Sequence, residues 1–106
     1  LVFPEGPAYD GKGAIYVSNC NADFVYKINK EGTALSFQAA TDKYTFEKTN
    51  GMTFFEDGSL FACDFGRKAI IRIYMDGRME NFADKFGDTG FMGPNDLAFD
   101  PDGNLY

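Results

Sequence analysis

Short apolar runs, each bounded by turn residues, recur along the whole chain. The runs are rich in Ile, Val, Phe and Tyr, and none keeps the 3.6-residue spacing of an amphipathic helix. Asp57-Gly58 and Asp102-Gly103 lie between successive runs, and such pairs supply the positive φ of a tight hairpin turn. The pattern predicts an all-β chain. Its strands are expected at residues 6–9, 14–19, 24–29, 34–39, 51–55, 60–64, 69–75 and 80–84.

The same pattern returns after 45 residues without a gap. Gly13, Gly58 and Gly103 coincide under this shift. Several apolar positions coincide with them, namely Tyr9, Phe54 and Phe99, and Ile15, Leu60 and Leu105. Four short strands in a repeat of this length are typical of a β-propeller blade. WD40 repeats are disfavoured, because the chain has neither His nor Trp for their Gly-His and Trp-Asp motifs.

The repeat divides the chain, residues 1–106, into blades of four antiparallel strands. Blade one is expected at about 1–45, blade two at about 46–90, and the first strand of a third blade at 91–106. Propellers typically close with four to eight blades, and open blades expose sheet edges. The chain is therefore expected to be a piece of a longer protein or a protomer that closes by assembling. As an isolated chain, we expect it to associate through its open edges and to show little activity.

Polar residues open the first strand of each blade. Glu5, Asn50 and Asn95 are spaced 45 residues apart. The first strands of propeller blades line the central channel, so these side chains are expected to converge at one rim. Converging carboxylate and amide oxygens suit a hard cation such as Ca²⁺. The alternative is that they cap strands or face water in the channel, and Asn-Gly is also an ordinary turn pair.

Residues at the ends of the second strands are expected at the same rim, because successive strands run antiparallel. Asn19 and Asp64 hold these positions, as candidates for substrate contact or for bracing the site. The loops at 19–23 and 64–68 and the connections at 40–49 and 85–94 should face the rim as well. Three apolar residues of these loops could wall a pocket or pack in the core: Phe65, Phe91 and Met92.

Composition narrows the function further. The formal net charge is −6, which argues against nucleic acid or an anionic membrane as a partner and suits a cation or a small ligand, although it also serves solubility. The chain has no His, so a His-based triad, base or metal ligand is excluded within it. Cys20 and Cys63 lie far apart and lack CxxC spacing, so the sequence does not indicate a thiolate metal site. No membrane-spanning apolar run or signal peptide is visible, and the compartment stays unknown.

Three segments resemble the regucalcin/gluconolactonase family of six-bladed propellers. They are "FPEGPAYD" at 3–10, "NGMTFFEDGSLFACD" at 50–64 and "GPNDLAFDPDGNLY" at 93–106. The resemblance implies a lactone hydrolase with a divalent cation on the propeller axis, commonly Ca²⁺ or Zn²⁺. The expected partner is thus a small-molecule lactone, with Ca²⁺ as the first choice of cofactor.

The resemblance also implies roles for single residues. Glu5 matches the family's first metal ligand, and Asn95 matches an asparagine that reaches the metal directly or through water or substrate. Asp96 matches a position that holds a second, structural calcium in paraoxonase-like members, whereas Asn50 has a less settled role. The remaining ligands and the general base are expected beyond Tyr106, so no catalytic residue is assigned within this segment.

One departure from the family bears on the substrate. Regucalcin-type members carry an arginine two residues before the asparagine, where this chain has Gly93, which argues against a preference for sugar lactones. Two other functions fit the same repeat, because a fold does not fix a function. One is a non-catalytic NHL-like propeller that serves as a binding or scaffold module. The other is an enzyme similar to strictosidine synthase or streptogramin lyase.

Overall fold

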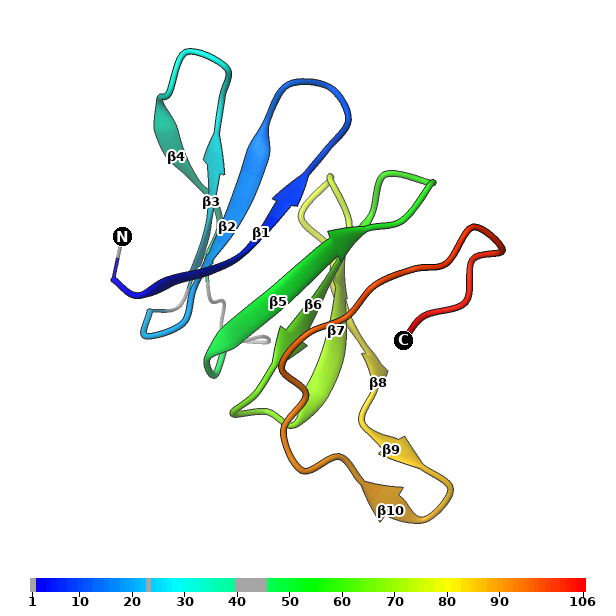
Figure 1. The fold of residues 1–106 in the computed structure, drawn as a ribbon. Helices are drawn as coiled ribbons and strands as arrows, with labels where there is room; N and C mark the ends of the chain where they lie inside the picture. The colour runs from blue at the N-terminus through cyan, green and yellow to red at the C-terminus, as the bar shows by residue number, and fades with distance from the viewer. Residues whose placement is uncertain (1, 23, 40–45) are drawn as a thin grey trace.

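The computed structural model describes residues 2–22, 24–39 and 46–106, and within these ranges the chain is all-β with no helix. Two antiparallel meanders of four strands follow one another (Figure 1). The first sheet contains β1 (Pro4–Tyr9), β2 (Ile15–Asn19), β3 (Phe24–Ile28) and β4 (Ala34–Ala39). The second contains β5 (Thr49–Phe54), β6 (Leu60–Asp64), β7 (Ala69–Ile73) and β8 (Met79–Ala83). The predicted strands of both blades are confirmed, with small shifts at their ends.

Two local features differ from the prediction. A short hairpin, β9 (Lys85–Phe86) and β10 (Thr89–Gly90), occupies the connection expected to be a loop. Its turn is Gly87-Asp88. Strands of this length are too short to show an alternation of apolar and polar residues, so the sequence pattern does not predict them. Residues 91–106 form no continuous inner strand. Their ladder is limited to the Phe99–Leu105 bridge, beside which Ala98 and Tyr106 exchange both backbone hydrogen bonds, and a strand needs a longer ladder to be regular.

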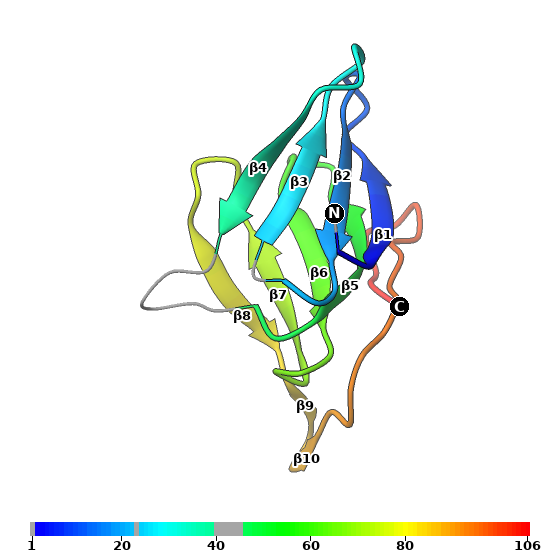
Figure 2. The same cartoon turned by 90° about the vertical axis from the view of Figure 1, so that its left-hand side faces the viewer.

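The two sheets pack face to face, with the inner strands β1 and β5 in contact. Figure 1 shows these strands side by side, and the C-terminal segment crosses next to β5. The hairpins that join β1 to β2 and β5 to β6 lie at one end of the sheets. In Figure 2 the β9–β10 hairpin projects from the opposite end, where β1 and β5 begin. We call this second end the rim.

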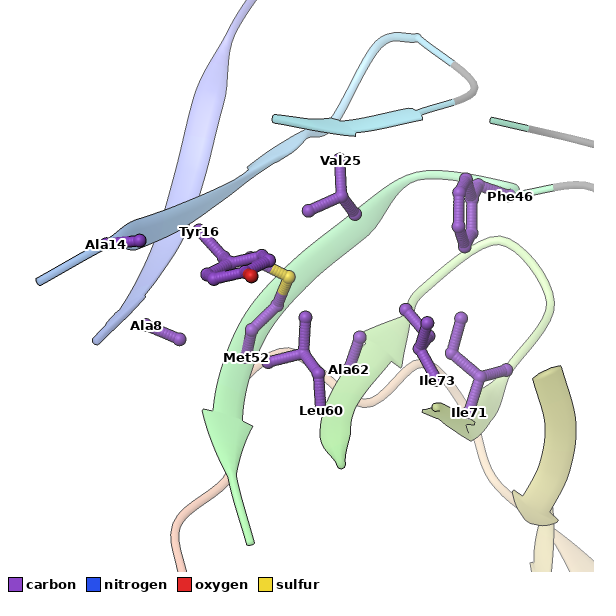
Figure 3. Packing of buried hydrophobic residues seen from close by; sticks show 10 residues of the cluster. All are labelled: Ala8, Ala14, Tyr16, Val25, Phe46, Met52, Leu60, Ala62, Ile71 and Ile73. Carbon is purple, nitrogen blue, oxygen red and sulfur yellow. The ribbon is translucent and has the colours of Figure 1, made fainter. Parts of the chain in front are cut away.

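A buried cluster joins the two sheets (Figure 3). Tyr16 and Val25 of the first sheet point toward Met52 and Leu60 of the second, and Val25 and Leu60 have no exposed surface. The Tyr16 ring packs edge-on against Phe54 at a centroid distance of 5.0 Å. Fully burying such a side chain contributes roughly 2 kcal/mol, so this interface is a main source of stability.

A second cluster repeats the first at a distance of 45 residues. Phe61, Ile70 and Leu97 are buried and take the places that Tyr16, Val25 and Met52 hold in the first cluster. Residues 91–106 therefore pack on the second sheet as the second sheet packs on the first. None of the described ranges contains a helix long and apolar enough to span a membrane.

Candidate functional site

The inner strands are irregular at the rim. In β1 the pairing with β2 shifts register between Glu5 and Ala8, and in β5 the pairing with β6 shifts between Thr49 and Met52. Bulges of this kind redirect side chains and are frequent beside functional sites. The Ser18 hydroxyl donates to the Glu5 carbonyl oxygen at 2.9 Å, which holds the first bulge in place. Both strands therefore present the residue before their glycine, Glu5 or Asn50, at the rim.

Glycine lets neighbouring inner strands approach closely here. A Cβ atom on Gly6 would lie 2.0 Å from the Asn50 carbonyl oxygen, and one on Gly51 would lie 2.7 Å from the Asn95 carbonyl oxygen. The Gly51 N–H donates to that same Asn95 oxygen at 2.8 Å. No side chain fits at either contact. The glycine of each Glu-Gly or Asn-Gly pair is thus needed for the close packing of neighbouring inner strands, and not only for a turn.

The close approach brings the polar residues together in one groove. A cavity of about 290 Å³ is lined by Glu5, Asn50, Asn95 and Asp96, together with Gly6, Pro7, Gly51 and Met52. The four polar residues come from three successive repeats, and three of them, Glu5, Asn50 and Asn95, converge as their 45-residue register predicts. Among the residues that the structure describes, no Lys or Arg lines the groove. The groove therefore concentrates carboxylate and amide groups without a basic partner.

This donor set offers oxygen ligands to a cation. Asp96 Oδ1 also accepts the Leu97 N–H at 2.9 Å, which orients the carboxylate over Gly51. Across residues 2–22, 24–39 and 46–106, no group of three His, Cys, Asp or Glu side chains is placed to bind a metal. Any cation here would accordingly depend on amide or backbone oxygens as well as on the two carboxylates.

Asn19 and Asp64 lie elsewhere and have another role. Both are fully buried, and neither lines the groove. Asn19 Oδ1 accepts the Val2 N–H at 2.7 Å, while the Asp64 carboxylate accepts the N–H groups of Glu47 at 2.8 Å and Arg67 at 3.0 Å. These side chains brace the segments that lead into the inner strands. This arrangement agrees with the bracing alternative, since neither side chain lines the groove.

The two cysteines are free thiols. Cys63 is fully buried in β6, and burial, with a smaller contribution from the negative charge of Asp96, raises its pKa to about 12. The Cys63 thiol is therefore protonated at neutral pH and is not available as a metal-binding thiolate.

Phe65, Met92 and Gly93 form a feature of the rim that the sequence showed only in part. Gly93 has a φ of 144°, and a Cβ atom there would lie 2.7 Å from the Phe65 ring. Phe65 is 45% exposed and Met92 is 92% exposed, so both present apolar surface to solvent. Phe91 is instead half-buried in the second cluster, in the position that Phe46 takes in the first. Packing thus accounts for Phe91 but not for Met92.

Comparison with known proteins places this geometry in context. Residues 3–106 match the family model described as the SMP-30/gluconolactonase/LRE-like region. A search of curated proteins found no match. Among solved structures, the chain is similar to a gluconolactonase from Xanthomonas campestris, described as important in glucose secondary metabolic pathways. Identity is 27% and the TM-score 0.86, and the match covers 98% of this chain and 34% of that one.

Other solved structures share the fold. A putative gluconolactonase is 25% identical with a TM-score of 0.82, over 99% of this chain and 35% of that chain. Virginiamycin B lyase from Staphylococcus aureus has a TM-score of 0.75 over 96% of this chain and 33% of that one. At 19% identity it supports the architecture alone. The chain spans about a third of the length of these structures.

Proposed function

Because the chain belongs to the SMP-30/gluconolactonase/LRE-like family, we propose that its protein is a lactone hydrolase that works with a divalent cation. The observation that carries the proposal is the groove in which Glu5, Asn50, Asn95 and Asp96 converge. The similarity to gluconolactonases supports a lactone as the substrate.

The residues fit a hard cation. Their side chains offer carboxylate and amide oxygens, and none of the described residues that line the groove is basic. Ca²⁺ accepts such all-oxygen sites with flexible geometry, whereas Zn²⁺ favours His and Cys, neither of which lines the groove. We therefore propose Ca²⁺ as the first candidate and Zn²⁺ as the second, with Glu5 and Asn95 as the ligands.

In this proposal each residue of the groove has its own role. A bound cation supplies polarisation of the ester carbonyl and stabilises negative charge on its oxygen. Glu5 provides the ligand charge, and its backbone carbonyl is fixed by Ser18. The Asn95 amide can ligate or donate a hydrogen bond to the lactone, while Asp96 and Asn50 bound the groove. We propose that a carboxylate from another blade removes the proton of the attacking water.

The test is a substitution that keeps the shape of the ligand and removes its charge. In the whole protein, Glu5→Gln should lower kcat/KM for lactone hydrolysis by about 100-fold or more and weaken Ca²⁺ binding measured by calorimetry. Glu56→Gln is the matched control. Glu56 is an exposed carboxylic acid in the hairpin between β5 and β6, at the end of the sheets away from the rim. Unchanged hydrolysis and metal binding in Glu5→Gln would contradict the proposal.

A further inference from the structure

The rim carries exposed apolar side chains beside the polar groove. Met92 is 92% exposed and Phe65 is 45% exposed, and both lie on loops at this end of the sheets. Phe86 is 88% exposed in the β9–β10 hairpin, which projects from the same end (Figure 2). Exposed large apolar side chains gathered near a polar groove indicate a binding surface more often than isolated ones do.

The repeat shows that the rim differs between blades. Phe65 takes the place of Cys20, and its N–H donates to the Lys48 carbonyl as the Cys20 N–H donates to that of Phe3. Phe3, Lys48 and Gly93 share one position of the repeat, and all three have a positive φ.

Only the last of these three positions is a glycine, and the Phe65 ring lies directly on it. At the corresponding position one repeat earlier, Lys48 carries a charged side chain. Where the preceding repeat has a thiol and a cation, Phe65 and Gly93 thus provide an aromatic ring packed on a glycine, two residues before Asn95 in the sequence.

An apolar groove adjoins the polar one. A cavity of about 510 Å³ is lined on its rim side by Phe91, Met92, Gly93 and Pro94, and it shares Asp96 with the polar groove. Its far side, at Ile70 and Leu105, belongs to the packing face of the second cluster. The rim side thus leads from the polar groove onto apolar surface. A ligand placed there would have its polar head in the polar groove, by the shared Asp96, and its apolar extension over Met92, beside the Phe65 ring that packs on Gly93.

We infer that the substrate is a lactone with an alkyl or aryl substituent, held by Phe65 and Met92, and not a polyhydroxylated sugar lactone. This inference rests on the proposed function and specifies its substrate class. A sugar lactone would need a polar partner for each hydroxyl that loses water. The exposed side chains of Phe65 and Met92 supply no such partners.

The test compares three δ-lactones that share one ring. δ-Valerolactone has no substituent, δ-decanolactone has an alkyl chain, and glucono-δ-lactone has hydroxyl groups. For the whole protein, kcat/KM divided by the uncatalysed rate constant should be at least about tenfold higher for δ-decanolactone than for either other lactone, because each buried methylene adds roughly three- to fourfold. Met92→Gln should reduce the value for δ-decanolactone about threefold or more, through KM, and reduce the value for δ-valerolactone by a smaller factor.

Met75→Gln is the matched control, because Met75 is 46% exposed in the hairpin at the opposite end of the sheets. It should leave all three values unchanged. A preference for glucono-δ-lactone, or no effect of Met92→Gln on δ-decanolactone, would overturn the inference and leave the proposed function standing. If none of the lactones is hydrolysed faster than in the protein-free control, both fail.

Discussion

The two sheets are built from the same repeat, yet they are buried to different degrees. All five residues of β6 are buried, whereas Ile15, the first residue of the equivalent β2, is 45% exposed. Ile73 of β7 has no exposed surface, while its equivalent Ile28 in β3 is half-buried. The strand sequences are equally apolar at these positions. The difference therefore comes from the surroundings of each sheet.

The second sheet is covered on both faces. The first sheet packs on one side, with Tyr16 and Val25, and residues 91–106 pack on the other, with Leu97. The first sheet has such a neighbour on one side only within the described chain. A blade thus owes much of its stability to the blades beside it, and equivalent residues can contribute unequally.

The largest expected effect tests this inequality directly. Leu60→Ala should lower the free energy of unfolding by about 3 kcal/mol, because Leu60 is fully buried and the substitution leaves a cavity. Ile15→Ala, at the equivalent position of the first sheet, should cost about 1 kcal/mol or less in the same 106-residue chain. Urea unfolding with an unchanged m-value gives both numbers.

Equal losses from the two substitutions would contradict the comparison. Repeating both in the whole protein sharpens it. If another blade covers the first sheet there, the cost of Ile15→Ala should rise toward that of Leu60→Ala, since burial is then restored.

Much of this architecture is predictable from the sequence, because local chemistry repeats with it. The strands and the Asp-Gly hairpins follow from alternation and turn residues, and the 45-residue register places Glu5, Asn50 and Asn95 at one rim. Alternation and register, however, specify which end of a strand and which face of the sheet a residue occupies, and not which groups its side chain meets there. That limit explains why the sequence left two roles open for Asn19 and Asp64, substrate contact or bracing, whereas the structure shows both side chains accepting hydrogen bonds from backbone N–H groups outside the groove.

The contact of Phe65 with Gly93 was beyond sequence reasoning for a related reason. It joins a loop of one repeat to the start of the next and depends on a positive φ at Gly93. The positive φ at Lys48 and Phe3 is equally invisible in the sequence, since side chains rarely adopt it. Gly93 alone indicates such a conformation in the sequence, and the family resemblance relates this position to an arginine without indicating the contact with Phe65.

A smaller effect is expected at the buried braces. Asp64→Ala should cost about 2 to 3 kcal/mol, because two backbone N–H groups lose their carboxylate acceptor in a buried place. Asn19→Ala should cost about 1 kcal/mol, because it breaks one such bond and also removes the buried Nδ2 group, which has no hydrogen-bond partner in the described residues. Thermal unfolding at constant pH measures both.

Asp64→Asn is the informative control, because the first sheet has an asparagine, Asn19, at the equivalent position. It keeps one acceptor oxygen and should recover part of the loss caused by Asp64→Ala. A full loss in Asp64→Asn would mean that the charge, and not the hydrogen-bond geometry, holds the segment that contains Glu47 and Arg67.

The smallest effect concerns acid stability at the hairpin end, where the sheets again differ. The Ser59 hydroxyl and backbone N–H, with a further contribution from Arg72, lower the pKa of Asp57 in the second sheet. In the first sheet, the N–H groups of Ala14 and Lys12 lower the pKa of Asp10. A carboxylate whose pKa is lowered by folding contributes stability above its unfolded value of about 3.9, and this contribution is lost as the pH falls through the folded value.

Asp57→Asn and Asp10→Asn should therefore each destabilise the chain at neutral pH, and each difference from the wild type should vanish in acid, below both pKa values. Added salt should weaken the effect of Asp57→Asn more, because Asp57 forms an ion pair with Arg72. Asp102→Asn, in the exposed turn of the C-terminal segment, controls for loss of charge alone. A difference that persists unchanged in acid would show that the carboxylate charge contributes nothing at that hairpin, and that its sheet depends there on shape and packing.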